Sequence, residues 1–77
     1  MSKRVRFPVV KPVALIRALE RAGFALHHTS GSHCILRHSE RRSRVTVPFH
    51  HHDLKRGTLR AILRQAALSV EELIELL

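Results

Sequence analysis

Apolar residues recur at helical spacing in two parts of the chain. Over residues 12–22 the apolar side chains share one side and the charged ones the other, and Pro12 suits a first helical turn, where its missing N–H is not needed. Gly23 then follows as a left-handed cap, so we predict a helix over 12–22. The spacing i, i+3, i+4, i+7 over residues 59–66 predicts a second amphipathic helix from about Thr58.

The C-terminal segment begins with a helix-start signal. Ser69 is followed three residues later by Glu72, which matches a capping box, and leucines between residues 73 and 77 form the apolar side of a last helix. Asp53 is a candidate cap for a short turn over 54–56. These signals predict three helices in total.

Between the first two helices the pattern changes to the alternation of strands. Residues 24–29 are compatible with a strand that places Phe24 and Leu26 on one face, and Ala25 and His27 on the other. Residues 44–48 form a further candidate, rich in β-branched side chains and ended by a proline that cannot donate to a ladder.

The middle strand, over residues 33–38, carries the candidate chemistry. Its alternation groups His33, Ile35 and Arg37 on one face. We expect Cys34 and Leu36 to face the core. With these two side chains inward, His33 and Arg37 are expected to be exposed on the other face.

The order of elements is α-β-β-β-α with an added terminal helix, which predicts an α+β fold. Helices on one face of a three-stranded antiparallel meander form a two-layer sandwich. A chain of 77 residues allows one domain. We assign residues 1–10 to a basic N-terminal arm that includes Lys3 and Arg4, and residues 11–77 to the folded domain.

The net charge of the chain narrows the class of molecule that it is expected to bind. The chain has 14 Lys+Arg against 6 Asp+Glu, a net charge of +8. This favours nucleic acid over a membrane surface, because no strongly amphipathic basic helix with bulky aromatics is present; charge that serves solubility alone is the alternative. No stretch approaches the roughly 20 apolar residues of a membrane span, and no signal peptide is visible. With a single cysteine, Cys34, no intramolecular disulfide is expected, and we predict a cytoplasmic protein.

The stretch from Ser30 to His33 is the candidate active site. Gly31 can adopt backbone angles closed to other residues, and Ser32 completes a small polar turn before the histidine. Histidine suits a general base because its ordinary pKa, about 6.5, lies near working pH. Arg37, on the same predicted face, could hold a phosphate bidentately. On the residues alone, a structural histidine stays an open alternative.

Four ordered pieces of the chain resemble the HicA-type toxins of prokaryotic toxin–antitoxin systems: residues 17–24, 31–33, 45–48 and 57–66. The resemblance implies a fold like the double-stranded-RNA-binding domain and an activity that cleaves mRNA. It also implies that His33 is the catalytic residue, beside Gly31 and Ser32 as substrate contacts. A HicB-type antitoxin is the implied protein partner.

Two positions depart from the pattern of that family. The family often has Pro-Asp-Gly between the second and third strands, where this chain has the longer and more basic stretch 39–43. The family also commonly has glycine where Ala67 stands. If that position needs a positive φ, alanine costs roughly 1 kcal/mol there.

Metal-independent RNA cleavage needs a base, a cation and an acid. Arg60 and Arg64 lie one helical turn apart, so they could grip phosphates or meet acidic residues of an antitoxin. The acid stays open among His27, His28 and His38, which we otherwise interpret as side chains of the strand surface without a role. We interpret 50–52 as a polar loop, because further metal ligands at recognisable spacing are missing, and we expect no cofactor. The alternative function is a non-catalytic RNA-binding module of the same fold.

Overall fold

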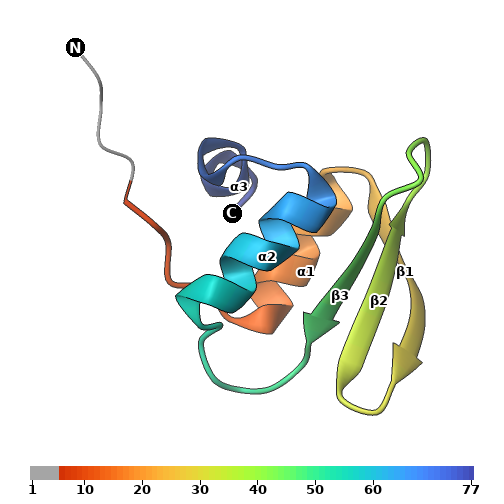
Figure 1. The fold of residues 1–77 in the computed structure, drawn as a ribbon, viewed down its shortest axis with the longest axis horizontal. Coiled ribbons are helices and arrows are strands. Elements are labelled where there is room, and N and C mark those ends of the chain that lie inside the picture. Colours follow the sequence, from red (N-terminus) through yellow and green to blue (C-terminus); the bar gives the residue numbers. More distant parts are fainter. Residues whose placement is uncertain (1–5) are drawn as a thin grey trace.

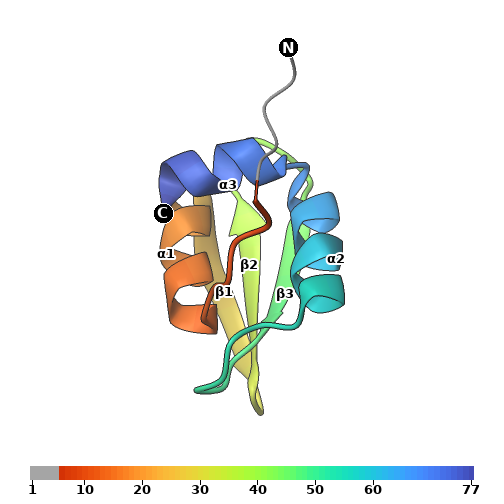
Figure 2. The same ribbon diagram turned by 90° about the vertical axis from the view of Figure 1, so that its left-hand side faces the viewer.

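Six elements follow one another in the computed structural model, which describes residues 6–77. In chain order they are α1 (Pro12–Arg21), β1 (Phe24–Ser30), β2 (His33–His38), β3 (Arg44–Pro48), α2 (Arg56–Ala66) and α3 (Val70–Leu76). This order confirms the predicted α+β class with an added C-terminal helix. Figures 1 and 2 show α1 and α2 on the same face of the sheet, with α3 across one end of the helix layer.

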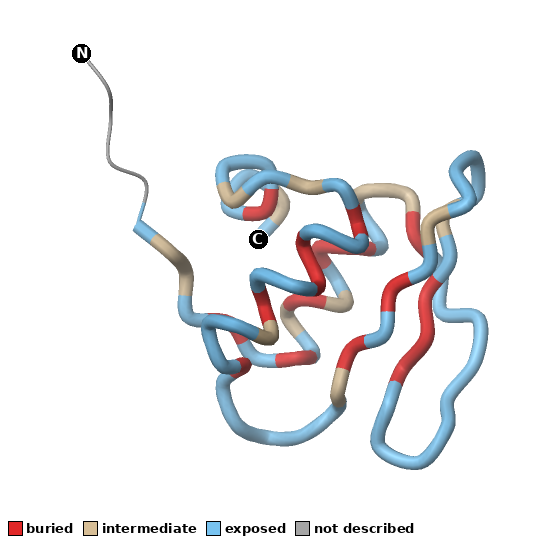
Figure 3. Tube along the Cα trace, in the orientation of Figure 1, coloured by how far each residue is buried: buried red, intermediate tan, exposed pale blue. Residues whose placement is uncertain are grey.

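The central strand of the sheet is β2, which is antiparallel to both neighbours. Cys34 lies opposite Val47, and Leu36 lies opposite Val45. All four side chains are buried toward the helices, which confirms the predicted phase of β2. The core therefore lies between this face and the helix layer, and the other face of the sheet carries no helix (Figures 1 and 3).

The first strand departs from the predicted alternation at His27. Leu26 pairs with Leu36, but the next pair is His28 with Ile35, so one extra residue interrupts the ladder. Such irregularities are common on edge strands, where one side of the strand has no partner to hold the register. As a result His28 pairs with Ile35 and lies on the face away from the helices, where the predicted alternation had not placed it.

The ends of α1 and α2 are each followed by a residue with a positive φ angle. Gly23, after α1, has a φ of 103°, and a Cβ there would come within 2.7 Å of the His38 Nε2 atom. Ala67, after α2, has a φ of 56° and ψ of 39°. The position does require the left-handed conformation, so alanine carries the cost that glycine would avoid.

The two later helices begin differently. The capping box of α3 is confirmed, because the Ser69 side chain accepts from the Glu72 N–H and the Glu72 side chain accepts from the Ser69 N–H. α2 begins at Arg56, ahead of the predicted Thr58, without a side-chain cap. The expected turn after Asp53 is absent: residues 53–55 form no turn.

The segment before α1 packs on the domain. Val10 is buried, its carbonyl accepts a hydrogen bond of 2.8 Å from the Leu54 N–H, and Phe7 packs against the core. Burial of Leu54 anchors the loop before α2 in the same place. Lys3 and Arg4, the other predicted features of the arm, lie outside the described residues. No helix within residues 6–77 has the length and apolar character needed to cross a membrane.

Candidate active site

A tight turn places His33 at the start of β2. Gly31 has a φ of 58°, the left-handed region that favours glycine. The Ser32 carbonyl accepts a 2.6 Å hydrogen bond from the Phe49 N–H, which ties this turn to the chain after β3. The His33 side chain is exposed, so its backbone is fixed while its ring stays accessible.

The strand register gives the neighbours of His33 on the open face of the sheet. Across the strands, His33 lies opposite Ser30 and Pro48. Ile35 follows on the same face and is only 9% exposed, although no helix covers it. Its register partners are His28 and Thr46, and flanking side chains account for its burial. An apolar centre with polar side chains around it is an arrangement that can hold a ribose and its phosphate.

A second histidine joins this face because of the irregularity in β1. His28 pairs with Ile35 while Ser30 pairs with His33, so His28 is the diagonal neighbour of His33. Diagonal neighbours in an antiparallel pair are about 7–8 Å apart. Both side chains are exposed on the same side of the sheet. Two imidazoles at that separation can flank one phosphodiester, and the alternation in the sequence had placed His27 here instead.

His38, at the other end of β2, is occupied by structural contacts. Its Nδ1 atom accepts from the N–H groups of Glu40 and Arg41, at 3.0 and 3.2 Å, and its Nε2 atom lies 3.1 Å from the Ala22 carbonyl oxygen. The ring also meets Phe24 edge-on, with centroids 5.0 Å apart. The neutral tautomer with hydrogen on Nε2 satisfies every one of these contacts. The His38 ring therefore supports the structure of the hairpin and is a poor candidate for the general acid of RNA cleavage.

Residues 50–52 form a loop beside the turn that carries His33. The Nδ1 atom of His50 accepts from the His52 N–H at 3.2 Å, and the two rings lie 5.7 Å apart. Both line a cavity of about 390 Å³ together with Lys55 and Thr58, at the start of α2. In the part of the chain that the structure describes, no group of three or more His, Cys, Asp or Glu side chains is arranged to hold a metal ion.

The predicted phosphate contacts fall in separate places. Arg37 shares the face of His33, but four residues of strand separate their Cα atoms by roughly 13 Å, which suits different phosphates better than a single one. Arg60 and Arg64 are exposed on α2, in the helix layer. The Arg60 guanidinium lies 5.3 Å from the centroid of the Phe7 ring, and that of Arg56 lies 5.0 Å from it. An RNA that reaches both α2 and the open face has to pass around the β3 edge.

A comparison with known protein families gives a match over most of the chain. A family model described as the HicA toxin of bacterial toxin–antitoxin systems matches residues 14–68, which is more than half of the chain. The matched region contains the whole sheet and α2, and with them every predicted site residue, from Gly31 to Arg64. No curated protein matches the chain.

Proposed function

This chain belongs to the HicA toxin family of bacterial toxin–antitoxin systems, and we propose that it acts there as a metal-independent endoribonuclease on mRNA. The observation that carries the proposal is an accessible imidazole, His33, on a fixed turn at the edge of an open and basic sheet face. A HicB-type antitoxin is the proposed inhibitor. It would silence the toxin by covering this face.

We propose that His33 and His28 divide the proton transfers. His33 takes the proton from the ribose 2′-OH, and the 2′ oxygen attacks the adjacent phosphorus. The bond from phosphorus to the 5′ oxygen breaks, and the protonated ring of His28 gives its proton to that leaving oxygen. The products are a 2′,3′-cyclic phosphate and a free 5′-OH. Neither histidine needs a metal for this chemistry.

The choice of His28 as the acid rests on elimination by position. His38 already uses both ring nitrogens, and it lies on the helix side of the sheet. His50 and His52 line a cavity at the start of α2. His28 shares the open face with His33 through its register pairing with Ile35.

The rival function is an RNA-binding module without catalysis. Its support is the basic surface itself, because Arg60 and Arg64 are exposed and need no imidazole to hold phosphates. The two functions differ in what they require of His33. Binding depends on the arginines, whereas cleavage depends on the ring.

The test is cleavage of a 5′-labelled mRNA fragment by the purified chain in the presence of a metal chelator. We expect products that end in 2′,3′-cyclic phosphate, and His33→Gln should lower the rate about 10²–10⁴-fold without weakening binding. RNA that is bound but not cut by the wild-type chain would favour the rival function. His33→Gln that cuts at the wild-type rate would remove His33 from the mechanism.

The acid is tested by a pair of neighbouring variants. His28→Ala should lower the cleavage rate and remove one limb of a bell-shaped pH profile, because a profile of that shape reports one base and one acid. His27→Ala is the matched control, since it removes an exposed histidine one residue away, at the irregular position in the ladder. Equal losses from the two variants would contradict the assignment of His28.

A further inference from the structure

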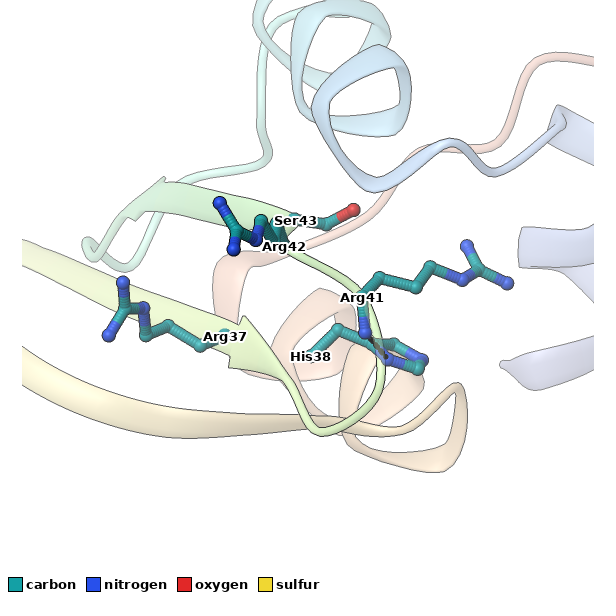
Figure 4. A pocket seen from close by; sticks show the side chains of 5 residues that line it. All are labelled: Arg37, His38, Arg41, Arg42 and Ser43. Atoms are coloured by element: carbon teal, nitrogen blue, oxygen red, sulfur yellow. Dashed lines mark hydrogen bonds between the residues drawn. The ribbon is translucent and has the colours of Figure 1, made fainter.

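A second basic site lies at the hairpin between β2 and β3, at the opposite end of β2 from His33. A cavity of about 480 Å³ opens there, lined by Arg37, His38, Arg41, Arg42 and Ser43. Figure 4 shows the guanidinium groups of Arg37 and Arg42 extending to the same side of the hairpin, whereas Arg41 extends the opposite way. The hairpin therefore presents two cations together on one side.

The positive charge of Arg37 lies opposite another positive charge in the sheet rather than opposite an acidic residue. The register partner of Arg37 on β3 is Arg44, and its partner on β1 is Ala25. Like charges directly opposite each other on one face destabilise a sheet pair. Neither register partner of Arg37 is an acid, so the strand pairing itself does not offset this repulsion. An arrangement of that kind is stabilised when an anion binds between the cations.

Arg41, in the same loop, is an arginine whose charge lies near acidic side chains. Besides the first cavity, it lines a second one together with Glu72 and Glu75 of α3. Hydrogen bonds from Ser69 lower the pKa of Glu72, and the positive charge of Arg41 lowers it further. The acidic helix thus faces Arg41, and it leaves Arg37 and Arg42 for another partner.

The hairpin is also held in a defined shape before any ligand arrives. The His38 ring accepts from the backbone of Glu40 and Arg41, while the Ser39 N–H donates to the Gly23 carbonyl at 3.3 Å. The His38 N–H donates to the Ser43 carbonyl at 3.2 Å. These bonds fix the loop that carries Arg42, so little conformational freedom is lost when an anion binds.

We propose that Arg37, Arg42 and Arg44 form a second phosphate-binding site, which holds the RNA strand at a phosphate other than the one cleaved beside His33. The inference rests on the proposed function. Three observations carry it: the pairing of Arg37 with Arg44 in the sheet register, the roughly 13 Å of strand between Arg37 and His33, and their common open face. Arginine forks match phosphate oxygens bidentately. An acidic protein surface would also suit these cations, but the continuity with His33 along one strand favours the substrate.

The experiment measures RNA binding in the His33→Ala background, where cleavage does not interfere. Arg42→Gln should weaken binding of a single-stranded RNA about tenfold and reduce the slope of log affinity against log salt by about 0.7, the value for one phosphate contact on a single strand. Arg17→Gln is the matched control, because it removes the same charge from an exposed position on α1. It should change affinity little, and melting temperatures verify that both variants are folded.

The phosphate itself is located with a series of RNAs, each carrying one uncharged methylphosphonate. In the His33→Ala protein, two positions should weaken binding most: the cleaved phosphate and a more distant one. In the Arg42→Gln variant, the distant position should lose its effect while the cleaved position keeps it. The pattern identifies a second site rather than a general loss of charge.

Three outcomes would overturn the inference, and they differ in what else they affect. If wild type cleaves RNA but Arg42→Gln binds it as tightly as the His33→Ala parent, the second site is absent and the proposed function stands. If Arg42→Gln keeps its affinity for RNA and loses affinity for a purified HicB-type antitoxin, the arginines form a protein interface. If the chain neither binds nor cleaves RNA, the proposed function fails and the inference fails with it.

Discussion

The two histidines at the ends of β2 have the same side chain and lie in opposite environments. His33 begins the strand on the open face, exposed. His38 ends it on the helix side, half-buried, with both ring nitrogens in contact with backbone atoms of Ala22, Glu40 and Arg41. The position of each histidine along β2 therefore decides whether its ring nitrogens are free to contact a substrate. An imidazole can act on a substrate only when the fold has left its nitrogens free.

The largest effect that this comparison predicts is at His33, which lies on the open face. His33→Ala should lower RNA cleavage about 10²–10⁴-fold, because it removes the proposed base. The melting temperature should stay close to that of wild type, since the side chain is exposed and supports no core contact. Cleavage assays and thermal denaturation of one preparation measure both. A large drop in melting temperature would mean that His33 is structural as well.

The next effect concerns the fit between Gly23 and the His38 ring. Gly23→Ala should destabilise the fold by about 2 kcal/mol or more, because alanine is strained at a φ of 103° and its Cβ would meet the His38 Nε2 atom at 2.7 Å. Denaturant unfolding measures the change. Gly57→Ala is the control, since a Cβ there meets no atom within 4 Å. Equal costs at the two glycines would show that the ring does not occupy this space.

A smaller effect belongs to the His38 ring itself. His38→Ala should cost about 1–3 kcal/mol of unfolding free energy, because it leaves hydrogen-bonding groups of α1 and the hairpin without a partner. The folded fraction should still cleave RNA. A His38→Ala protein that is fully folded and inactive would make the ring catalytic and reverse the comparison.

A second substitution separates stability from chemistry at His38. Ala67→Gly should add about 1 kcal/mol, because Ala67 sits at a φ of 56°. If His38 acts only through stability, this change should restore part of the activity that His38→Ala loses at a temperature near its melting point. No recovery, despite a restored melting temperature, would point to a role for the ring beyond support.

Much of the fold was predictable because its signals are local. The helical spacing of α1 and α2, the capping box of α3 and the alternation of β2 each depend on residues close in sequence, and the structure confirms them. The face of His33 followed from the same alternation. The sequence resemblance also led to the family that the comparison then showed.

Other features depended on contacts that no local pattern records. The extra residue at His27 shifts the ladder of β1 and moves His28 onto the open face, and a register is set by the partner strand rather than by the strand's own residues. The half-buried His38 was expected on the surface, because its partners at Ala22 and in the hairpin lie beyond the reach of strand alternation.

The amino-acid sequence by itself determined the order of the elements, the family, and the turn that presents His33. The tertiary structure alone decided that His28 shares that face, through the register of β1 with β2. It also set Arg37 against Arg44 without an acid between them. The physical reason is one of range: propensity and periodicity act over a few residues, whereas the placement of charges and rings is fixed by the register between strands.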